Sequence, residues 1–351
     1  MRTKHFSGRI LTLSAIQSAA LLLFLVACTG GVFATAIEPI PEKDGFSGFF
    51  NIGGSWMQMK SNTIVGTRFG DLSKDRIDSL DDTPDSESLA MPMINGELRY
   101  TFADTGTQLF AGNALDDWIR LDLSSAAGVR QRWDDKGIFE GAFLFTAVPT
   151  EVWEDPYVVG QKREEADRTS AGGRLGWSRV FNSNVHLSYS YRDIELDDEN
   201  SGILLGLSPA ERDLLSREGD HHKAELLYVH QLRENQWLTP TFYYNRFDLD
   251  GEAMSHDLYS VMLTHTYAAQ KFRLITNLVY GFAGYDERNP IYHKTRDADR
   301  YGISVTTLYP NLFNVPKLTG VLGVAYWLED SNIDFYDSEI VAITASTLYR
   351  F

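Results

Sequence analysis

The residues best suited to chemistry are charged side chains at the polar positions of segments in which every second residue is apolar. This pattern singles out Arg99, Arg130, Arg132, Arg174, Arg192, Arg273, Glu97, Glu140 and Glu225. Alternate residues of a β-strand point to opposite faces of a sheet, so these groups would share one wet face. Charges that line a water-filled passage bias which ions enter it, so the nine residues are candidate pore-lining groups.

Two interpretations of these charged groups are open. The set is net basic, which predicts a mild preference for anionic solutes. Alternatively, the arginines pair with the glutamates and with loop carboxylates and so brace a wall. A register shift of one residue would turn all of them outward, so the sequence does not choose between the two interpretations.

The segments that carry these charges alternate with a period of two. Val185 and Leu187 share one face of such a segment, and His186 and Ser188 share the other. This is the period of a strand with one oily and one wet face. Fourteen segments of this kind can be counted, at 45–59, 91–103, 107–114, 124–133, 137–148, 168–181, 184–195, 222–232, 237–247, 257–267, 272–283, 300–309, 318–327 and 339–351.

The links between these segments alternate in length. Links after even-numbered segments are short, such as 104–106 and 182–183, whereas links after odd-numbered segments are mostly long and charged. A transmembrane barrel with both ends in the periplasm has short turns on that side and long loops outside. A soluble sandwich has no reason to sort its loops in this way. The sequence therefore predicts an all-β fold, a transmembrane antiparallel up-and-down β-barrel of about 14 strands.

The chain end and the aromatic residues agree with a barrel. The last segment ends on Phe351, with Tyr349 on the same face, which resembles the carboxy-terminal signal of bacterial outer-membrane barrels. Aromatic residues near the short-turn rim would form a girdle at the boundary of oil and water. They are Trp133, Phe181, Trp237, Tyr267, Phe272, Tyr309, Phe313, Tyr349 and Phe351.

The first 36 residues have the pattern of a signal peptide. Arg2, Lys4 and Arg9 precede an apolar run, and 34–36 matches a small-x-small cleavage site. Residues 25–28 resemble a lipoprotein box, so lipidation of Cys28 is an alternative. The predicted organisation is a signal peptide at 1–36, a short periplasmic segment at 37–44 and a barrel at 45–351. The Sec signal predicts export to the Gram-negative outer membrane.

Composition excludes several classes. The chain has 32 Lys+Arg against 48 Asp+Glu, a formal net charge of −16, which argues against nucleic acid as a partner. A single cysteine excludes a disulfide scaffold and a four-cysteine zinc site. No cofactor and no metal are predicted. Asp197–Gly202 begins a poor calcium loop, because Ser208 stands where a bidentate glutamate belongs.

The predicted outer loops are acidic, most densely between Asp71 and Glu87. Loops that are merely solvated by water would account for this charge. The alternative is that divalent cations bridge the loop carboxylates to anionic lipopolysaccharide. The expected partners are therefore outer-membrane lipid, lipopolysaccharide and small solutes. In the longest loop, Ser208 with Glu211 makes a capping box that predicts a short helix. We expect the apolar segment 203–207 before it to fold into the barrel mouth or against a neighbour, and to act as a constriction.

Signatures of catalysis are weak. Neither Gly-x-Ser-x-Gly nor His-Glu-x-x-His occurs in the sequence. Ser255 and His256 are adjacent, and neighbours in a strand point to opposite faces, so they would not form a dyad there. We expect that the chain is not an enzyme, and an outer-membrane lipid-modifying enzyme is the least favoured alternative.

The start of the barrel region carries a resemblance. Pro41–Gly48, followed by Gly53–Gly54 and Ser61–Asn62, resembles the start of an uncharacterised, domain-of-unknown-function family of Gram-negative outer-membrane proteins. More broadly, the chain is similar to monomeric fourteen-stranded porins. Fourteen-stranded fatty-acid transporters carry a longer amino-terminal plug than 37–44 could provide. The resemblance implies a porin-like barrel and a monomer, and it gives no information on the solute.

These observations favour one function and leave a second open. Eight strands leave a filled interior and sixteen leave an open channel, so fourteen predict a narrowed water-filled passage. We expect a porin-like channel for passive diffusion of small hydrophilic solutes, with anions preferred if the arginines line it. A closed barrel that acts as a surface adhesin or structural anchor is the alternative.

Overall fold

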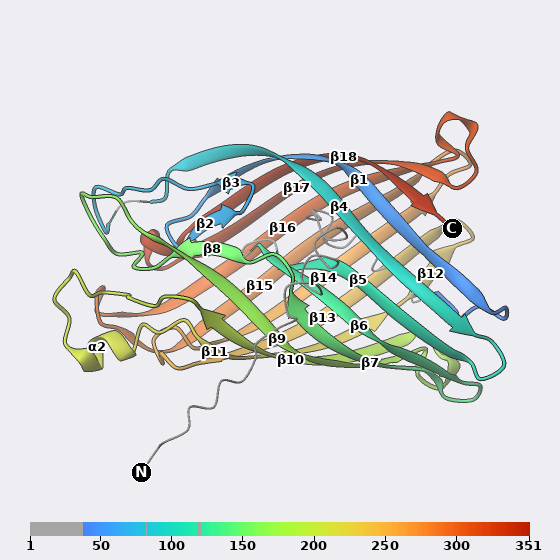
Figure 1. Ribbon diagram of the computed structural model, residues 1–351, viewed down its shortest axis with the longest axis horizontal. Coiled ribbons are helices and arrows are strands. Elements are labelled where there is room, and N and C mark those ends of the chain that lie inside the picture. The colour runs from blue at the N-terminus through green and yellow to red at the C-terminus, as the bar shows by residue number, and fades with distance from the viewer. Residues whose placement is uncertain (1–37, 82, 118–120) are drawn as a thin grey trace, which may run out of the picture.

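The computed structural model describes residues 38–81, 83–117 and 121–351, which form a closed antiparallel β-barrel (Figure 1). Fourteen strands build the wall, which confirms the predicted fold class and strand number. The wall strands are β1 (Gly45–Lys60), β4 (Ser86–Phe102), β5 (Thr107–Asp117), β6 (Asp122–Trp133), β7 (Gly137–Thr146), β9 (Glu165–Ser178), β10 (Val185–Leu196), β11 (Gly219–Tyr228) continued by β12 (His230–Arg233), β13 (Gln236–Leu249), β14 (His256–Ala268), β15 (Arg273–Asn289), β16 (Lys294–Pro310), β17 (Leu318–Ser331) and β18 (Ser338–Arg350). The predicted signal peptide and Cys28 lie outside the described residues.

The first and last wall strands close the barrel. β1 pairs with β18 in antiparallel register from Phe49 opposite Arg350 to Lys60 opposite Glu339. The Lys60 ammonium lies 2.8 Å from the Glu339 carboxylate at the far end of this seam. Every wall strand thus has a partner on both sides for part of its length, so the sheet has no free edge strand.

Each predicted segment falls on one wall strand, but several strands run farther than predicted. β15 continues to Asn289 and β16 begins at Lys294, so this hairpin extends well beyond its apolar region. Backbone hydrogen bonds hold a strand pair whatever its side chains are. Hydrophobic alternation therefore marks only the part of each strand that faces lipid.

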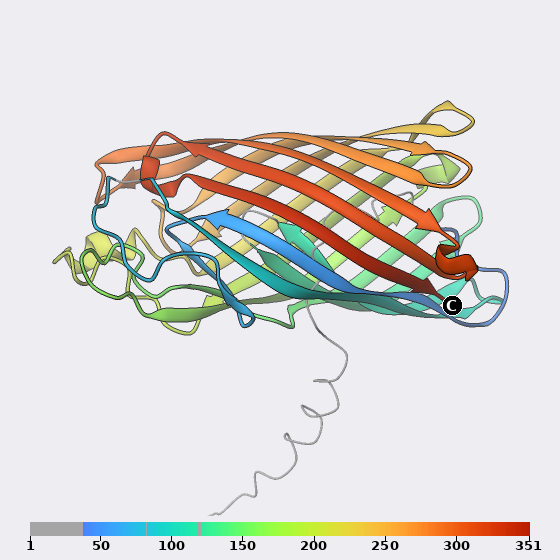
Figure 2. The same cartoon turned by 90° about the horizontal axis from the view of Figure 1, so that it is seen from above.

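The long loops and the short turns lie at opposite ends of the barrel, as predicted. The long loops and α2 (Pro209–Asp213) gather at the left of Figure 1, and the short turns and the carboxy terminus lie at the right. Figure 2 shows how strongly the strands tilt between the two ends. We call these the loop end and the turn end. Among the described residues, no helix is long and apolar enough to cross a membrane.

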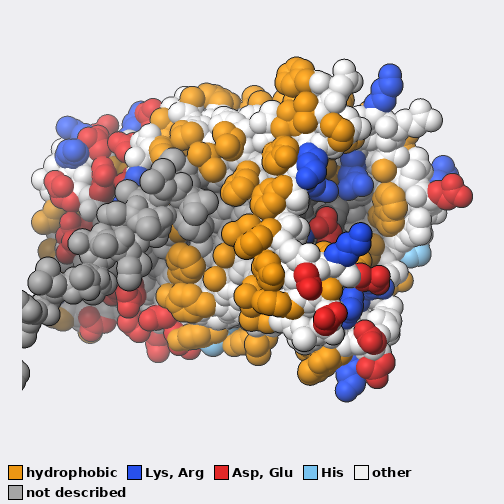
Figure 3. Space-filling view, turned by 45° about the vertical axis from the view of Figure 1, so that its right-hand side comes forward, with side chains coloured by type: hydrophobic (Ala, Val, Ile, Leu, Met, Phe, Trp, Pro, Cys, Tyr) orange, Lys and Arg blue, Asp and Glu red, His pale blue; other side chains and the backbone are white. Residues whose placement is uncertain are grey.

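The outer face of the wall is apolar and the inner face is polar. On β15, Leu278 is 50% exposed while its neighbour Asn277 is 3% exposed, and on β17 the outward Leu322 is 54% exposed. The space-filling view shows apolar side chains across the middle of the barrel and charged side chains at both ends (Figure 3). Such a belt is stable in a bilayer and not in water.

Aromatic side chains border this apolar belt. At the turn end, Trp133 contacts Phe139 and Phe272 contacts both Tyr267 and Tyr309. At the other border, outward tyrosines donate hydrogen bonds to carboxylates on neighbouring strands. These pairs are Tyr191–Asp220, Tyr244–Asp257 and Tyr280–Asp299, with hydroxyl-to-carboxylate distances of 2.7, 2.8 and 2.8 Å. Tyrosine suits this position because its ring is apolar and its hydroxyl is wet.

Two turns at the turn end share one unusual backbone. The turns are built on the 3-10 segments η1 (Val180–Asn182) and η2 (Leu312–Asn314), preceded by Arg179 and Asn311. Phe181 and Phe313 have φ values of 48° and 54°, a conformation that costs about 1–3 kcal/mol for a side chain of this kind. Both rings are largely exposed. Their aromatic anchoring at the rim explains why they stand at strained positions.

The first long loop adds a hairpin to the barrel. Strands β2 (Ile64–Thr67) and β3 (Gly70–Asp71) pair with each other, and β2 also pairs with β8 (Thr150–Trp153), which continues the wall beside β9. Ile64 and Leu72 of this loop are buried against Met57 and Met93 on the inner face of the wall. Burial of each such aliphatic side chain is worth about 1.5–3 kcal/mol, so the loop is packed into the barrel.

Candidate solute site in the barrel lumen

Five of the nine predicted residues form one ion-pair network inside the wall, near the turn end. Arg130 on β6 lies 3.0 Å from Glu97 on β4 and 2.8 Å from Glu140 on β7. Arg174 on β9 lies 2.8 Å from Glu140, and Arg99 pairs with Glu97. We call this chain Arg99–Glu97–Arg130–Glu140–Arg174 the Arg–Glu ladder. Its charges balance to within one unit, because each glutamate bridges two arginines.

The other four predicted residues lie outside the ladder. The Arg132 guanidinium donates to the Ile40 carbonyl at 3.4 Å, and the Arg192 guanidinium contacts the His221 ring nitrogen at 3.3 Å. Glu225 on β11 is partly buried, and Arg273 is an exposed first residue of β15. The structure thus brings together five of the nine groups, and it pairs them as the wall-bracing interpretation expects.

The amino-terminal segment ties into the ladder from the turn end. Glu38 accepts a hydrogen bond from Arg99 at 2.8 Å, and Ile40 is 2% exposed. Asp44 accepts a hydrogen bond from the Ala103 amide at 2.6 Å. The short stretch before β1 is therefore packed against the inner residues at this end, and it narrows the passage there.

A row of stacked rings crosses the inner wall nearer the loop end. His221, Phe247, His256 and Tyr285 are direct cross-strand partners on β11, β13, β14 and β15. Successive ring centroids are 4.1, 4.6 and 4.3 Å apart, with interplanar angles of 8°, 12° and 19°. We call this set the ring row. Because each ring covers the faces of its neighbours, the ring edges are what the lumen meets.

Arginines cap both ends of the ring row. Arg192 sits beside His221 as its direct cross-strand partner. At the other end, the Arg296 guanidinium lies 4.5 Å from the Tyr285 centroid and 4.1 Å from the Tyr336 centroid. Cation–π contacts of this kind are worth about 0.5–2 kcal/mol each. Arg296 is therefore fixed between two rings, with its donors at the edge of that sandwich.

A cavity of about 120 Å³ opens beside the ring row. Its lining comes from opposite sides of the barrel, with Ser170 of β9 on one side and Tyr285 of β15 on the other. Four arginines and one glutamate contribute to it: Arg168, Arg217, Arg296, Arg300 and Glu329. Glu329 pairs with both Arg296 and Arg300. We call this cavity the chamber, and arginine is the commonest charged residue among the described residues of its lining.

An apolar core formed by the long loops covers the chamber. Its buried members are Tyr157, Leu215, Met254, Ile333, Phe335 and Tyr336, and its partly buried members include Ile77, Leu80, Leu207, Ile291 and Tyr292. These residues come from six different loops between wall strands. We call them the lid core. Met254 and Tyr336 belong both to the lid core and to the chamber lining, so the lid core packs directly against the chamber.

Polar contacts lock the same lid. The Tyr157 and Tyr336 hydroxyls lie 2.7 Å apart, and Asn289 donates to the Tyr336 hydroxyl at 2.7 Å. Burial raises the pKa of Tyr157 well above its ordinary value, so both hydroxyls are neutral donors and acceptors at any physiological pH. Tyr292 donates to the Leu80 carbonyl at 3.2 Å, which joins two further loops.

Two arginines, the buried Arg163 and the partly buried Arg217, also hold the lid. Arg217 contacts Glu199 at 2.7 Å and donates to the Trp153 and Glu154 carbonyls. Arg163 stacks on Trp153 at 4.2 Å and donates to the carbonyls of Asn62 and Lys74. Burial lowers the pKa of Arg163 to about 10, so it stays charged at neutral pH. Arg163 thereby ties the third long loop to the first.

Of the two placements expected for segment 203–207, folding into the mouth is wrong for most of the segment, and packing against a neighbour stays a prediction. Ile203, Leu204 and Leu205 are exposed, and Leu204 is 62% exposed. Only Leu207 packs onto the lid core. The predicted helix is confirmed as α2: the Ser208 side chain accepts from the Glu211 amide, and Glu211 accepts from the Ser208 amide. Phe335 and Tyr336 of the η3 turn (Asp334–Tyr336) occupy the mouth instead.

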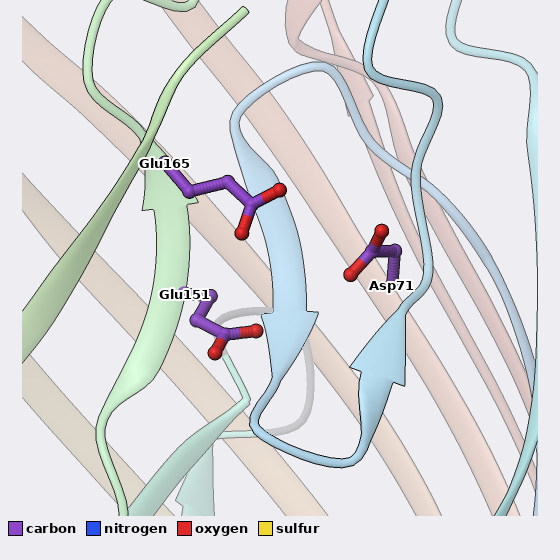
Figure 4. Close-up of side chains that lie close together, drawn as sticks. All are labelled: Asp71, Glu151 and Glu165. Carbon is purple, nitrogen blue, oxygen red and sulfur yellow. The ribbon is translucent and has the colours of Figure 1, made fainter.

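Three carboxylates form a separate cluster outside the chamber. Asp71 on β3, Glu151 on β8 and Glu165 on β9 place ligand oxygens within 4.8 Å of one another (Figure 4). Burial, followed by the charge of Glu165, raises the pKa of Glu151, and burial followed by the charge of Asp71 raises that of Glu165. Calcium takes six to eight oxygen ligands, so three carboxylates alone are an incomplete set.

The serine and histidines considered for catalysis have structural partners. Ser255 Oγ donates to the Leu249 carbonyl at 2.9 Å and accepts from the Leu249 amide at 2.9 Å. His256 contacts the Met254 carbonyl through Nδ1 and is stacked in the ring row. Within the described residues, Ser255 and His256 therefore form no hydrogen-bonded dyad.

A family profile described as "Protein of unknown function (DUF2860)" matches residues 45–350, the whole barrel. No curated protein matches the sequence significantly.

Several solved barrels are similar in architecture. The toluene transporter TbuX of Ralstonia pickettii is 11% identical, with a TM-score of 0.44, over 88% of this chain and 90% of that chain. The outer membrane channel DcaP of Acinetobacter baumannii is 10% identical, with a TM-score of 0.40, over 93% and 100%. A loop-deletion mutant of OmpT, an outer membrane protein of Vibrio cholerae, is 11% identical, with a TM-score of 0.40, over 88% and 100%. Similarity at this level does not identify a shared function.

Proposed function

This chain belongs to the DUF2860 family, and we propose that its barrel is an outer-membrane channel for passive diffusion of small hydrophilic solutes, with a preference for anions. The observation that carries the proposal is the chamber. It is a polar cavity in the bore of a closed fourteen-strand barrel, lined by four arginines and one glutamate. A barrel that served only as an anchor would have no need of such a basic interior.

The contrast between the lumen and the whole protein supports an anion preference. The chain carries a formal net charge of −16, so a basic lumen is not a consequence of its overall composition. Charges on the wall of a narrow passage act through a low effective dielectric and are weakly screened by salt. A basic ring in this position favours anions over cations.

The lid makes the proposed channel a gated one. The chamber volume of about 120 Å³ equals the liquid volume of roughly four water molecules. Ligand pockets for small organic molecules are usually about 300–1,000 Å³. A solute larger than a small ion therefore requires the lid core to move, and the conductance should be intermittent.

The surroundings follow from the same proposal. The apolar belt faces outer-membrane lipid, and the acidic loops face lipopolysaccharide. Both aromatic borders face lipid around the barrel, and the β1–β18 seam closes a single chain, so we propose a monomer.

A closed barrel that acts as a surface adhesin or anchor is the second candidate, and the lid core favours it. Six loops share one buried core, which is more than loose solvated loops would need. On this alternative the arginines of the chamber only hold the lid in place. A lipid-modifying enzyme finds no support in the contacts of Ser255 and His256 described above.

The test is the conductance of refolded mature protein in a planar bilayer under a salt gradient. The proposal expects discrete, intermittent steps with a reversal potential that favours anions. Steps that favour cations would retain the channel and overturn the anion preference. A silent bilayer, with folding verified by heat-shifted gel mobility, would overturn the channel and favour the closed barrel.

A further inference from the structure

We propose that the barrel wall has a lateral opening between β4 and β5, through which a solute with a flexible hydrocarbon chain passes between the bilayer and an apolar interior. The hairpin of β2 and β3 is the gate of this opening. Passage by this route goes beyond the aqueous channel and does not depend on it, because the solute enters through the wall and not through the loop end.

The strand pairing of β4 shows where the wall is split. On one side, β4 pairs with β1 along residues 86–101. On the other side, its pairing with β5 ends at Glu97 opposite Gly112. Beyond that pair, β5 continues with β6 alone. Toward the loop end, β4 and β5 are therefore separate strands, and we call the space between them the split.

The backbone of β4 is suited to an edge at this place. The Gly96 amide donates to the Asn113 side chain of β5 at 3.0 Å, where the two strands part. Alternate residues of a strand direct their backbone groups to the same side, so Ile94, Pro92 and Ala90 face the split as well. Proline has no amide hydrogen and is confined within sheets to edge strands, first positions and bulges. Pro92 thus stands where a neighbouring strand would need a donor.

The split begins within the apolar belt. Ile52 and Trp56 of β1 are the direct partners of Ile94 and Ala90, and they are 56% and 39% exposed on the outer face. At membrane depth, an open sheet edge is tolerated only where protein covers it or where it lines a cavity. A split at this height therefore requires a cover.

The hairpin of β2 and β3 provides that cover and is held by few contacts. β2 pairs with three residues of β8. Gly70 of β3 approaches β4 so closely that a Cβ atom there would lie 3.0 Å from the Leu89 side chain. Arg68, between β2 and β3, lies 3.1 Å from Asp167 of β9. An exposed ion pair of this kind is weak, so the hairpin can move while the wall strands stay paired.

Like charges oppose closure of the hairpin. Asp71 of β3 places a carboxylate oxygen within 4.8 Å of those of Glu151 on β8 and Glu165 on β9 (Figure 4). Negative charges at this distance repel one another. Apolar packing and the Arg68 ion pair hold the hairpin in place, and this repulsion works against them. Such a balance suits a segment that opens.

The interior beside the split is apolar and rich in methionine. Four of the chain's seven methionines lie on the inner face of β1 and β4. They are Met57, Met59, Met91 and Met93. Ile64 of β2 and Leu72, next to β3, pack against them. Methionine is flexible and adapts to irregular apolar partners, so a hydrocarbon chain that displaces the hairpin would meet a surface able to repack around it.

The same hairpin borders the chamber. Ile64 belongs both to this apolar cluster and to the chamber lining. Thr150 and Val152 of β8, which pair with β2, also line the chamber. Displacement of the hairpin would therefore join the split to the chamber, with the methionines along the way.

The experiment measures how fast a reagent dissolved in the bilayer reaches single engineered thiols. Cys28 is the only cysteine of the sequence and lies in the predicted signal peptide, so the mature protein has no thiol of its own. Met93→Cys places one beside the split. Ile275→Cys is the matched control, because Ile275 is as buried as Met93, at 1% against 0% exposed, and β15 is paired on both sides at that residue.

The refolded mature variants in liposomes are treated with N-dodecylmaleimide, and separately with the charged reagent 2-sulfonatoethyl methanethiosulfonate. We expect N-dodecylmaleimide to modify Met93→Cys several-fold faster than Ile275→Cys, and the charged reagent to show no such preference. Heat-shifted gel mobility verifies folding, and the unfolded proteins verify that both thiols react. Equal rates at the two thiols, or no modification of the folded Met93→Cys variant, would overturn the opening.

A second substitution tests the gate. Arg68→Ala in the Met93→Cys protein should raise the rate of modification by up to about fivefold, since it removes an exposed ion pair that holds the hairpin. Lys74→Ala is its control, because it removes an exposed ion pair with Asp85 in the same long loop but outside the hairpin. Equal rates in the two variants would overturn the hairpin as the gate.

Discussion

The chamber and the Arg–Glu ladder are both rich in arginine, and they differ in how those arginines are arranged. In the ladder, Glu97 and Glu140 alternate with three arginines, and one further carboxylate, Glu38, reaches Arg99. The described residues that line the chamber include four arginines and one glutamate; Glu329 pairs with Arg296 and Arg300, and Arg217 pairs with Glu199 outside the lining. The ladder lies near the turn end, where the segment before β1 packs against it, and the chamber lies against the lid core. The comparison teaches that arginines on a lumen wall can be joined with glutamates into one continuous network, as in the ladder, or can be held at separate points around a cavity, as in the chamber.

The largest expected effect comes from opening the lid above the chamber. Phe335→Ala removes a side chain that is 1% exposed at the centre of the lid core, a change that costs about 3–5 kcal/mol of packing. If that cost falls on lid closure, the open fraction in a bilayer rises by about 100-fold or more. Leu204→Ala, on an exposed loop position, should leave the open fraction unchanged. Unchanged conductance in the folded Phe335 variant would show that the lid core does not gate the passage.

A matched pair of glutamate substitutions compares how much the chamber and the ladder each contribute to the stability of the barrel. Glu329 bridges Arg296 and Arg300, and Glu140 bridges Arg130 and Arg174. Glu329→Gln should cost about 3–5 kcal/mol, because it removes a buried carboxylate charge that contacts two buried guanidiniums. Glu140→Gln should cost less, since the Arg174 side chain is 30% exposed and water can solvate it. Urea unfolding followed by tryptophan fluorescence measures both, and the reverse order would contradict the account.

Aromatic contacts at the chamber and at the ladder should give a smaller difference in stability. Phe247→Leu removes stacking on both His221 and His256, at about 0.5–1.5 kcal/mol for each contact. Phe110→Leu, beside the ladder, removes a single contact with Arg130 at 3.9 Å. In the same unfolding assay, the Phe247 variant should be less stable than the Phe110 variant. Equal losses would indicate that the ring row does not act as a continuous stack.

The smallest effect is expected at the cluster of Asp71, Glu151 and Glu165, which lies away from both the chamber and the ladder. The pKa of Glu151 is raised in the folded protein, so its contribution to stability is present at low pH and is lost as the pH rises through that raised value. Glu151→Gln should therefore stabilise the barrel at pH 7, by at most about 1 kcal/mol for a partly exposed group. It should also flatten the stability profile just above pH 4.5, the ordinary value. Destabilisation at pH 7 would mean that the ionised Glu151 carboxylate makes a net attractive interaction in the folded protein.

The sequence predicted the fold well because the barrel follows local rules. Period-two alternation marks the part of each strand that faces lipid, and the parity of link lengths fixes the order of turns and loops. All fourteen strands lie on their predicted segments, and the match over residues 45–350 agrees with the family resemblance drawn from the first of them. The ladder residues were also found, because Arg130 and Glu140 occupy lumen positions inside the apolar region.

The chamber was missed for a physical reason. Arg168 and Arg300 stand at the first positions of their predicted segments, and Arg296 lies outside them, where the outward face is no longer apolar. The surviving signal is parity: Arg296 and Arg300 share the face of Ser304, so extending the strand pattern past the apolar belt would have found them. The pairing of each arginine with a particular carboxylate depends on contacts between distant loops, and sequence spacing does not encode those contacts.

The mouth was predicted incorrectly for a related reason. Ile203–Leu207 was chosen for local hydrophobicity, but a loop position is buried only if other loops converge on it. Phe335–Tyr336 is an aromatic pair and Tyr157 is one aromatic residue in otherwise polar loops, and they become a core because six loops meet above the chamber. Local composition identifies apolar residues, and long-range packing decides which of them are covered.

The most direct test of the central claim, that the chamber and not the ladder sets ion preference, is the reversal potential of two single-charge variants. Arg168→Gln and Arg174→Gln remove the same charge from the same face of β9, one in the chamber and one in the ladder. Measured under one potassium chloride gradient, Arg168→Gln should shift the reversal potential toward cations, and Arg174→Gln should shift it much less. Equal shifts, or a larger shift for Arg174→Gln, would contradict the account.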